Sequence, residues 1–151
     1  MNLTRRHSGP ACFWCALLMV VTLWPVAAAA QPWVATDIGA THGVTTSVAY
    51  AVSDTGQVVG RYTTAGGETH AFSWTRSGGF VDLGTLGGTY SAAFGVNNAG
   101  QVVGSAYTAG DANFHAFLWS AATGMLDIGT LGGTDSVAYD INDAGQVVGS
   151  A

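Results

Sequence analysis

The chain has 151 residues, of which 48% are hydrophobic and 9% charged, and acidic residues outnumber basic ones by nine to four. Two of the basic residues, Arg5 and Arg6, lie near the N-terminus. From Gln31 onward two arginines stand against nine acidic residues, no lysine remains, and the formal charge is −7. Phosphate backbones and anionic lipid head groups are held mainly by lysine and arginine, so this composition excludes a nucleic-acid-binding protein and a protein that docks on acidic membranes.

The first thirty residues have the pattern of a secretory signal peptide. A short basic start is followed by an uncharged, mostly apolar run over 11–26 and by four alanines at 27–30, which suit the small-residue pocket of signal peptidase. We therefore expect residues 1–30 to be removed and residues 31–151 to form a secreted domain, located outside the cell, at its surface or in a periplasm.

Two further features of this segment bear on the mature protein. The uncharged stretch 11–30 is just long enough to span about 30 Å of hydrocarbon as an uncleaved anchor, although its alanine-rich end is weakly hydrophobic. Both cysteines, Cys12 and Cys15, lie inside it. Small exported domains commonly depend on disulfides, so after cleavage this one must be held together by packing alone.

Beyond the signal segment the sequence repeats with a period of about 45 residues, which is a signature of repeat architecture. The triplet Asp-Ile/Leu-Gly begins at three positions, each 45 residues after the last: Asp37, Asp82 and Asp127. The phrase "GQVVG" begins at Gly56, Gly100 and Gly145, with steps of 44 and 45 residues. Residues 31–151 therefore form one repeat domain with units that start near 37, 82 and 127, the last of them truncated.

Each complete unit contains four short strand patterns separated by turn residues. In the first unit they are "SVAYAVS" (47–53), "QVVGRYT" (57–63), "THAFSWT" (69–75) and "FVDLG" (80–84). These runs are rich in β-branched and aromatic residues and are bounded by Gly, Asn and Asp, whereas the apolar spacing of a helix is absent. The sequence predicts an all-β fold of four-stranded antiparallel meanders, with "WVATDIG" (33–39) as the last strand of a preceding unit.

A tight turn precedes each "GQVVG" phrase. The segment "DTG" at 54–56 fits a three-residue hairpin loop in which a type I turn is closed by a residue in the left-handed region. Glycine adopts that conformation without steric cost, so Gly56, Gly100 and Gly145 are predicted structural positions of the repeat.

The strand before each turn alternates large and small side chains. Strict alternation would place Val48, Tyr50 and Val52 on one face and Ala49 and Ala51 on the other. The aromatic position recurs in the next two units as Phe94 and Tyr139. Such a strand suits a sheet that is covered on both faces by neighbouring sheets.

Four strands in about 45 residues, covered on both faces, is the pattern of a β-propeller blade, and the domain would then hold about 2.7 blades. "HAF" followed by tryptophan (Trp74, Trp119), "DLGTLGG" or "DIGTLGG", and "GQVVG" together resemble the HAF repeat of bacterial extracellular proteins. The resemblance covers residues 37–151, although the first copy reads "DIGATHG". It implies an exported, propeller-like repeat protein and carries no particular chemistry.

A propeller closes its ring with four to eight blades, which is more than residues 31–151 supply. We therefore expect a segment of a longer array with open strand edges, through which the blade faces could self-associate. The alternative is a three-fold closed fold, a β-trefoil or β-prism, in which the "HAF" strand of the third unit would be missing.

Residues that recur in every copy are expected to have a structural role in the repeat, whereas a catalytic residue is usually unique. His70 and His115 recur and are expected to hydrogen-bond a neighbouring strand; with His42 they could also meet at a metal, but we predict no metal site. Trp74 and Trp119 are expected to pack in the core. Their alternative is an exposed indole that stacks on a sugar ring, which makes them the candidate ligand contacts.

Groups suited to catalysis are scarce. From residue 31 onward there is no cysteine or lysine nucleophile, no G-x-S-x-G and no H-E-x-x-H. "DINDAG" (140–145) resembles a calcium loop only faintly, and a hairpin turn is favoured. Asp135 and Asp140 would serve glycoside hydrolysis only if the fold paired them.

The sequence predicts a non-catalytic binding or scaffold module that has no cofactor and binds a glycan or protein ligand. The alternative is a carbohydrate-active fragment, either lectin-like or a glycosidase.

Overall fold

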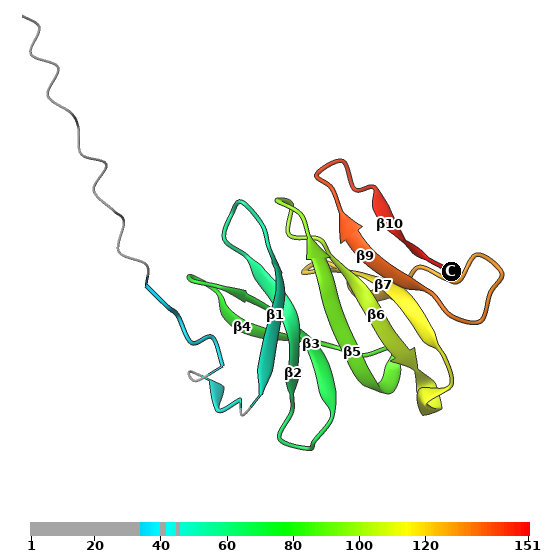
Figure 1. Cartoon of the computed structure of the whole chain (residues 1–151), viewed down its shortest axis with the longest axis horizontal. Helices are drawn as coiled ribbons and strands as arrows, with labels where there is room; N and C mark the ends of the chain where they lie inside the picture. Colours follow the sequence, from blue (N-terminus) through cyan, green and yellow to red (C-terminus); the bar gives the residue numbers. More distant parts are fainter. Residues whose placement is uncertain (1–33, 40–41, 45) are drawn as a thin grey trace, which may run out of the picture. The chain divides into compact units, whose positions relative to one another are not determined.

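The computed structural model contains ten β-strands and the short 3-10 turn η2 (Ala109–Asp111) in the part of the chain that it describes (Figure 1). It describes residues 34–39, 42–44 and 46–151, so the predicted signal peptide and its cleavage site lie outside the described residues. The all-β class is confirmed. Within the described residues no helix is long and apolar enough to cross a membrane.

In chain order the strands are β1 (Ser47–Val52), β2 (Val58–Thr63), β3 (Thr69–Thr75), β4 (Gly79–Gly84), β5 (Gly87–Val96), β6 (Val102–Thr108), β7 (Phe114–Ser120), β8 (Gly124–Asp127), β9 (Val137–Ile141) and β10 (Val147–Ser150).

The strands pair mainly with their neighbours in the sequence. β1 to β4 are joined by successive antiparallel pairings, and β5 to β8 repeat the same order. One parallel bridge, between Thr69 of β3 and Tyr90 of β5, links the two sets into a mostly antiparallel eight-stranded sheet. β9 and β10 form a separate antiparallel pair. The sheet does not close on itself within the described residues.

The predicted hairpin turns are confirmed. Gly56, Gly100 and Gly145 have φ angles of 81°, 81° and 78°, all in the left-handed region that favours glycine. The amide of each glycine donates to the carbonyl oxygen three residues earlier, at 2.9 to 3.1 Å. The first glycine of "GQVVG" is therefore required by the turn that it closes.

The second glycine of "GQVVG" is required by the strand opposite. Gly60 pairs with Ala49 beside a β-bulge in β1, and a Cβ added to Gly60 would lie 1.9 Å from the carbonyl oxygen of Val48. The same clash arises at Gly104 and at Gly149, with distances of 2.0 and 2.1 Å to the carbonyl oxygens opposite. No side chain fits there, which explains why the phrase ends in glycine in all three copies.

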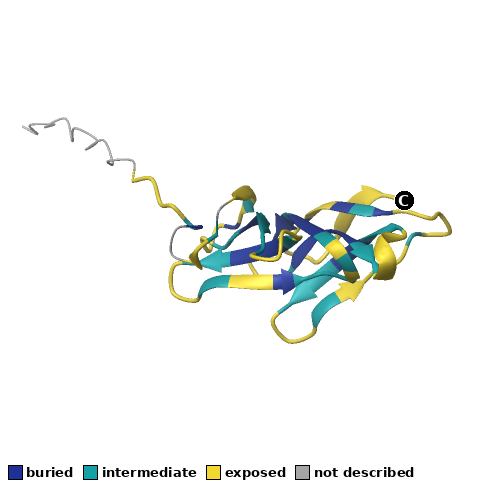
Figure 2. Cartoon of the chain, turned by 90° about the horizontal axis from the view of Figure 1, so that it is seen from below, coloured by how far each residue is buried: buried dark blue, intermediate teal, exposed yellow. Residues whose placement is uncertain are grey.

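The core lies between successive sets of strands. The larger buried cluster combines residues of β2 to β4, such as Val59 and Leu83, with residues of β5 to β7, such as Val102 and Phe117 (Figure 2, dark blue). A second cluster joins β6 and β7 to β9. Small side chains recur at these contacts and let the sets approach closely; they are Ala71, Ala93, Ala106, Ala116 and Ala138.

The strand predicted for "WVATDIG" is wrong over its described part, 34–39, which contains no strand and ends in a turn. β4 and β8, at whose ends the same Asp-Ile/Leu-Gly triplet recurs, each pair with the third strand of their own set. Asp37 instead accepts a hydrogen bond from the amide of Gly39 at 3.0 Å. Nearby, the His42 ring packs against Phe80 with 5.1 Å between ring centroids.

Candidate functional site

An aromatic residue lies at the bulge of β1, β5 and β9. The strand register shifts around Tyr50, Phe94 and Tyr139, which are therefore the extra residues of the bulged strands. The predicted strict alternation is accordingly wrong at this point. Ala49 and Ala51, expected on one face, pair with consecutive residues of β2, and consecutive residues of a strand face opposite sides.

β1, β5 and β9 lie next to one another (Figure 1), and their three aromatic rings form a continuous row. The ring centroids of Tyr50 and Phe94 are 5.4 Å apart, and those of Phe94 and Tyr139 are 6.4 Å apart. Tyr50 is 43% exposed and Tyr139 is 55% exposed, with Phe94 partly buried between them. We call these three side chains the aromatic row. Its exposed rings offer apolar faces to a ligand.

Arg61 lies beside the aromatic row. Its guanidinium carbon is 5.9 Å from the ring centroids of both Tyr50 and Tyr90, a distance that allows a cation–π interaction. One guanidinium nitrogen donates to the hydroxyl oxygen of Tyr90 at 2.9 Å. This hydrogen bond raises the pKa of Arg61. Since an arginine is protonated at neutral pH even without such a bond, the row has a fixed positive charge next to its first ring.

Polar turns follow the same three strands and are linked to one another. The side-chain amide of Asn98 donates to Asp54 at 3.2 Å and to Asp143 at 2.8 Å, and the amide of Asn97 donates to the carbonyl oxygen of Asn142 at 3.0 Å. A shallow depression is lined by these turns. Carboxylate and amide oxygens thus lie at the end of the strands that carry the aromatic row.

The recurring histidines pair with the recurring aspartates. Nδ1 of His70 on β3 lies 2.9 Å from Asp82 on β4, and Nδ1 of His115 on β7 lies 2.6 Å from Asp127 on β8. Both aspartates also accept a backbone amide two residues on, as Asp37 does. Partial burial, together with the hydrogen bond and charge of Asp82, raises the pKa of Tyr62 to about 12. Each pair joins the third strand of a set to the fourth.

The pair of His115 and Asp127 should make the free energy of unfolding depend on pH. Burial alone would raise the pKa of Asp127, but the hydrogen bonds from His115 and from the amide of Gly129 hold it below its ordinary value. An unfolded aspartate has a pKa near 3.9, so the stabilisation is complete above about pH 5 and is lost as the pH falls through the lowered folded pKa. The urea midpoint should therefore fall between pH 5 and pH 3.

The variants Asp127→Asn and His115→Gln separate this effect from that of the other carboxylates. Each removes one partner of the pair, so each should lose less stability than the original chain over the same pH interval, as followed by urea unfolding. An equal loss of stability in all three proteins would show that the pair does not contribute.

In the described part of the chain, the recurring histidines and the two candidate carboxylates, Asp135 and Asp140, are each held by hydrogen bonds. Among the described residues no three His, Cys, Asp or Glu side chains lie close enough to hold a metal ion. Asp135 accepts the amide of Phe114 at 3.0 Å, which lowers the pKa of Asp135. Asp140 accepts the amide of the residue that follows it. Both carboxylates are thus engaged with backbone amides.

The recurring tryptophans are half-buried. Trp119 packs against the larger buried cluster, and Trp74 pairs with Val58 of β2 and Phe80 of β4. The aromatic row therefore presents more exposed ring surface than Trp119 does. The recurring aromatic position was the feature of the sequence that could have identified the aromatic row. The assumption of strict alternation assigned those rings to packing instead.

Comparison with protein-family models, with curated proteins and with solved structures finds no match to this chain. Its function is therefore inferred from the geometry of the aromatic row and its surroundings.

Proposed function

We propose that this chain is an exported, non-catalytic binding module whose ligand contacts are the aromatic row. The single observation that carries the proposal is that three bulges place Tyr50, Phe94 and Tyr139 side by side and leave the outer two rings about half exposed. A bulge re-aims a side chain out of the regular sheet pattern. Three bulges aligned in this way make a surface that core packing does not require.

Neutral glycans are the ligand class that this surface fits. Aromatic faces stack on the apolar face of a sugar ring, and the row repeats such faces at centroid spacings of 5.4 and 6.4 Å. The oxygens of the neighbouring turns, Asp54 and Asp143 among them, can accept hydrogen bonds from sugar hydroxyls. The strongly acidic chain would repel a charged anionic ligand, so a neutral sugar is favoured.

The proposal includes the architecture and the location. The two four-strand sets, with corresponding histidine–aspartate pairs and second-glycine contacts, support propeller-type repeats that resemble the HAF family. The open sheet favours this reading over a β-trefoil or β-prism. The basic, apolar and alanine-rich segments within 1–30 support export by a cleaved signal peptide.

A glycan array of neutral oligosaccharides, probed with the secreted chain, tests the binding proposal. Calorimetry on the best ligand should show about tenfold weaker binding for Tyr139→Ala, because one stacking face is lost. The control Leu126→Ala removes a side chain of similar exposure outside the row and should leave binding unchanged.

Other outcomes would contradict the proposal. Binding that survives Tyr139→Ala but is lost in a folded Trp119→Ala variant would place the ligand on the indoles. Glycan turnover that is abolished by changing Asp135 or Asp140 would establish the enzyme alternative.

A further inference from the structure

A small polar cavity lies next to Arg61 in the first set of strands, β1 to β4. It has a volume of about 170 Å3, which is below the range of about 300 to 1,000 Å3 typical of pockets for drug-sized ligands. The residues that line it include Arg61 and no acidic residue. Four of them carry an aliphatic hydroxyl: Thr46, Ser47, Thr63 and Thr69. We call this space the Arg61 cavity; its size suits one small molecule.

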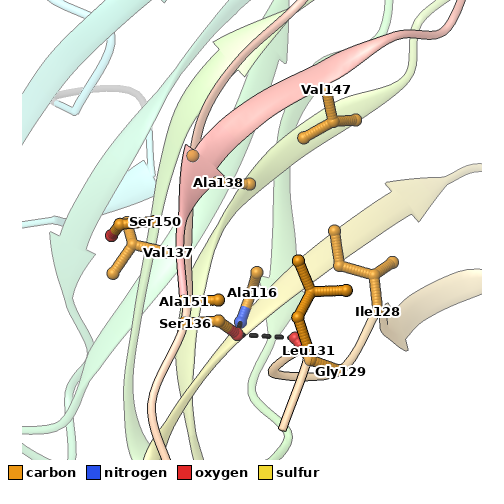
Figure 3. A pocket seen from close by; sticks show the side chains of 11 residues that line it. Ala116, Ile128, Gly129, Leu131, Ser136, Val137, Ala138, Val147, Ser150 and Ala151 are labelled. Atoms are coloured by element: carbon orange, nitrogen blue, oxygen red, sulfur yellow. Dashed lines mark hydrogen bonds between the residues drawn. The ribbon is translucent and has the colours of Figure 1, made fainter. Parts of the chain in front are cut away.

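The first set of strands contacts the second set, β5 to β8, in the same way as the second set contacts β9. In the first contact the hydroxyl of Ser91 accepts the amide of Ala71 at 2.7 Å and donates to the carbonyl oxygen of Gly84. Ser136 makes the same two hydrogen bonds one unit later (Figure 3). Residues at corresponding places in the two contacts can therefore be compared directly.

The Arg61 cavity lies where the two sets differ in sequence. Thr63 pairs with Thr69 across β2 and β3, and both line the cavity. The corresponding pair in the second set is Tyr107 and Phe114, whose rings stack with 3.9 Å between their centroids. Hydroxyls thus occupy, in the first set, the positions at which the second set has two large rings.

Arg61 itself departs from the repeat. The corresponding residue of the second set is Ser105, and Asp135 stands ahead of β9 at the place of its partner Tyr90. Arg61 is two residues from Thr63 on β2, so their side chains lie on the same face of the sheet. Because the other copies fold without this arginine, the repeat itself does not require it.

The guanidinium of Arg61 has no carboxylate partner among the described residues, where every ion pair involves a histidine. It is half-buried and is held by the hydroxyl of Tyr90 and by the ring faces of Tyr50 and Tyr90. A charge that is removed from water is costly unless it is paired. Arg76, by contrast, is exposed in the turn between β3 and β4, where water can surround it. Arg61 is therefore an oriented cation that lacks a counter-ion.

We propose that the Arg61 cavity binds the carboxylate of a small hydroxylated acid, such as a uronic acid. The guanidinium matches a carboxylate through two parallel N–H···O hydrogen bonds, and the hydroxyls around it can donate to and accept from the hydroxyls of the ligand. Asp54 and Asp143, which disfavour an anion at the turns beside the aromatic row, do not line this cavity. The proposal does not depend on the ligand of the aromatic row.

The test is a titration of the secreted chain with D-glucuronate, followed by the NMR spectrum of the protein. A salt concentration of about 0.15 M limits long-range repulsion by the acidic chain to about 8 Å. We expect saturable binding. D-glucose has the same ring with a hydroxymethyl group in place of the carboxylate, so it should bind at least about tenfold more weakly.

Variants of the chain locate the binding site. Arg61→Gln should weaken glucuronate binding at least about tenfold, because the carboxylate loses its charged partner. Arg76→Gln makes the same change in net charge at an exposed position outside the cavity and should leave the affinity unchanged. Thr69→Phe introduces the ring that the second set carries at Phe114 and should block the cavity without a change in charge. It is the second cavity variant if Arg61→Gln does not fold.

The methyl glycoside of D-glucuronate distinguishes two sources of such an acid. Affinity equal to that of glucuronate would assign the cavity to an acidic sugar unit of a glycan, and lower affinity would assign it to a free acid; both results support a carboxylate site. Absence of saturable glucuronate binding, equal affinity for glucose, unchanged affinity in a folded cavity variant, or an equal loss in Arg76→Gln would overturn the proposal.

Discussion

Replacing Gly104 by alanine is expected to lower the free energy of unfolding by at least about 3 kcal/mol. The added Cβ would lie 2.0 Å from the carbonyl oxygen of Ala92 and 2.8 Å from the ring of Phe117. Gly104 is buried between β5 and β7, so the backbone of β5 or the core around Phe117 has to move. Urea unfolding followed by circular dichroism measures the change.

Gly66→Ala is the matched control for Gly104→Ala. Gly66 lies in an exposed turn, has no unusual φ angle, and has no neighbour closer than 3.7 Å to an added Cβ. Its substitution should change stability by less than about 0.5 kcal/mol. Gly149→Ala should fall between the two, since β10 is an exposed edge strand that can shift. If Gly104→Ala were as stable as the control, the bulge would not be what requires the second glycine.

Truncating Phe117 to alanine is expected to cost about 3 to 5 kcal/mol of unfolding free energy. The ring is fully buried, and it belongs to the cluster that holds β2 to β4 against β5 to β7. With no disulfide to restrain the described chain, that packing must hold the two sets of strands together. The loss should appear as a lower urea midpoint.

The control for Phe117→Ala is Tyr139→Ala, which removes an aromatic ring that is about half exposed. The removal of surface exposed in the folded state should cost roughly 1 kcal/mol or less. Comparable losses from the two substitutions would mean that the aromatic row is as important to packing as the core is. That result would also weaken the case for a ligand on the row.

The turns could be predicted from the sequence because their chemistry is local. A glycine two residues after Asp54 or Asn98 is enough to specify a left-handed position, whatever lies elsewhere in the chain. The second glycine was not explained from the sequence, since its need arises from a carbonyl oxygen on the strand opposite, as Gly60 and Val48 illustrate. Register is a property of two strands together.

The candidate site, too, could be predicted only where it depends on local sequence and not where it depends on strand register. Periodicity identified His70 and Asp82 as recurring positions, but their pairing depends on the register between β3 and β4. Tyr50 and its counterparts were recognised as a recurring aromatic position, yet a period of two cannot reveal the bulge that turns them outward. The strand expected at 34–39 is absent, and its end forms a turn in which Asp37 accepts the amide of Gly39. An aspartate that bonds the backbone two residues on favours a turn over a strand.

The hydrogen bonds between turns limit which substitutions the three turns can accept. The amide of Asn98 donates to a carboxylate on either side, Asp54 and Asp143. An aspartate in the middle copy would bring three negative charges together, and an asparagine in a flanking copy would give up a charge-assisted acceptor. Successive turns are therefore complementary rather than interchangeable, and a mutation in one turn changes which residues its neighbours can accept.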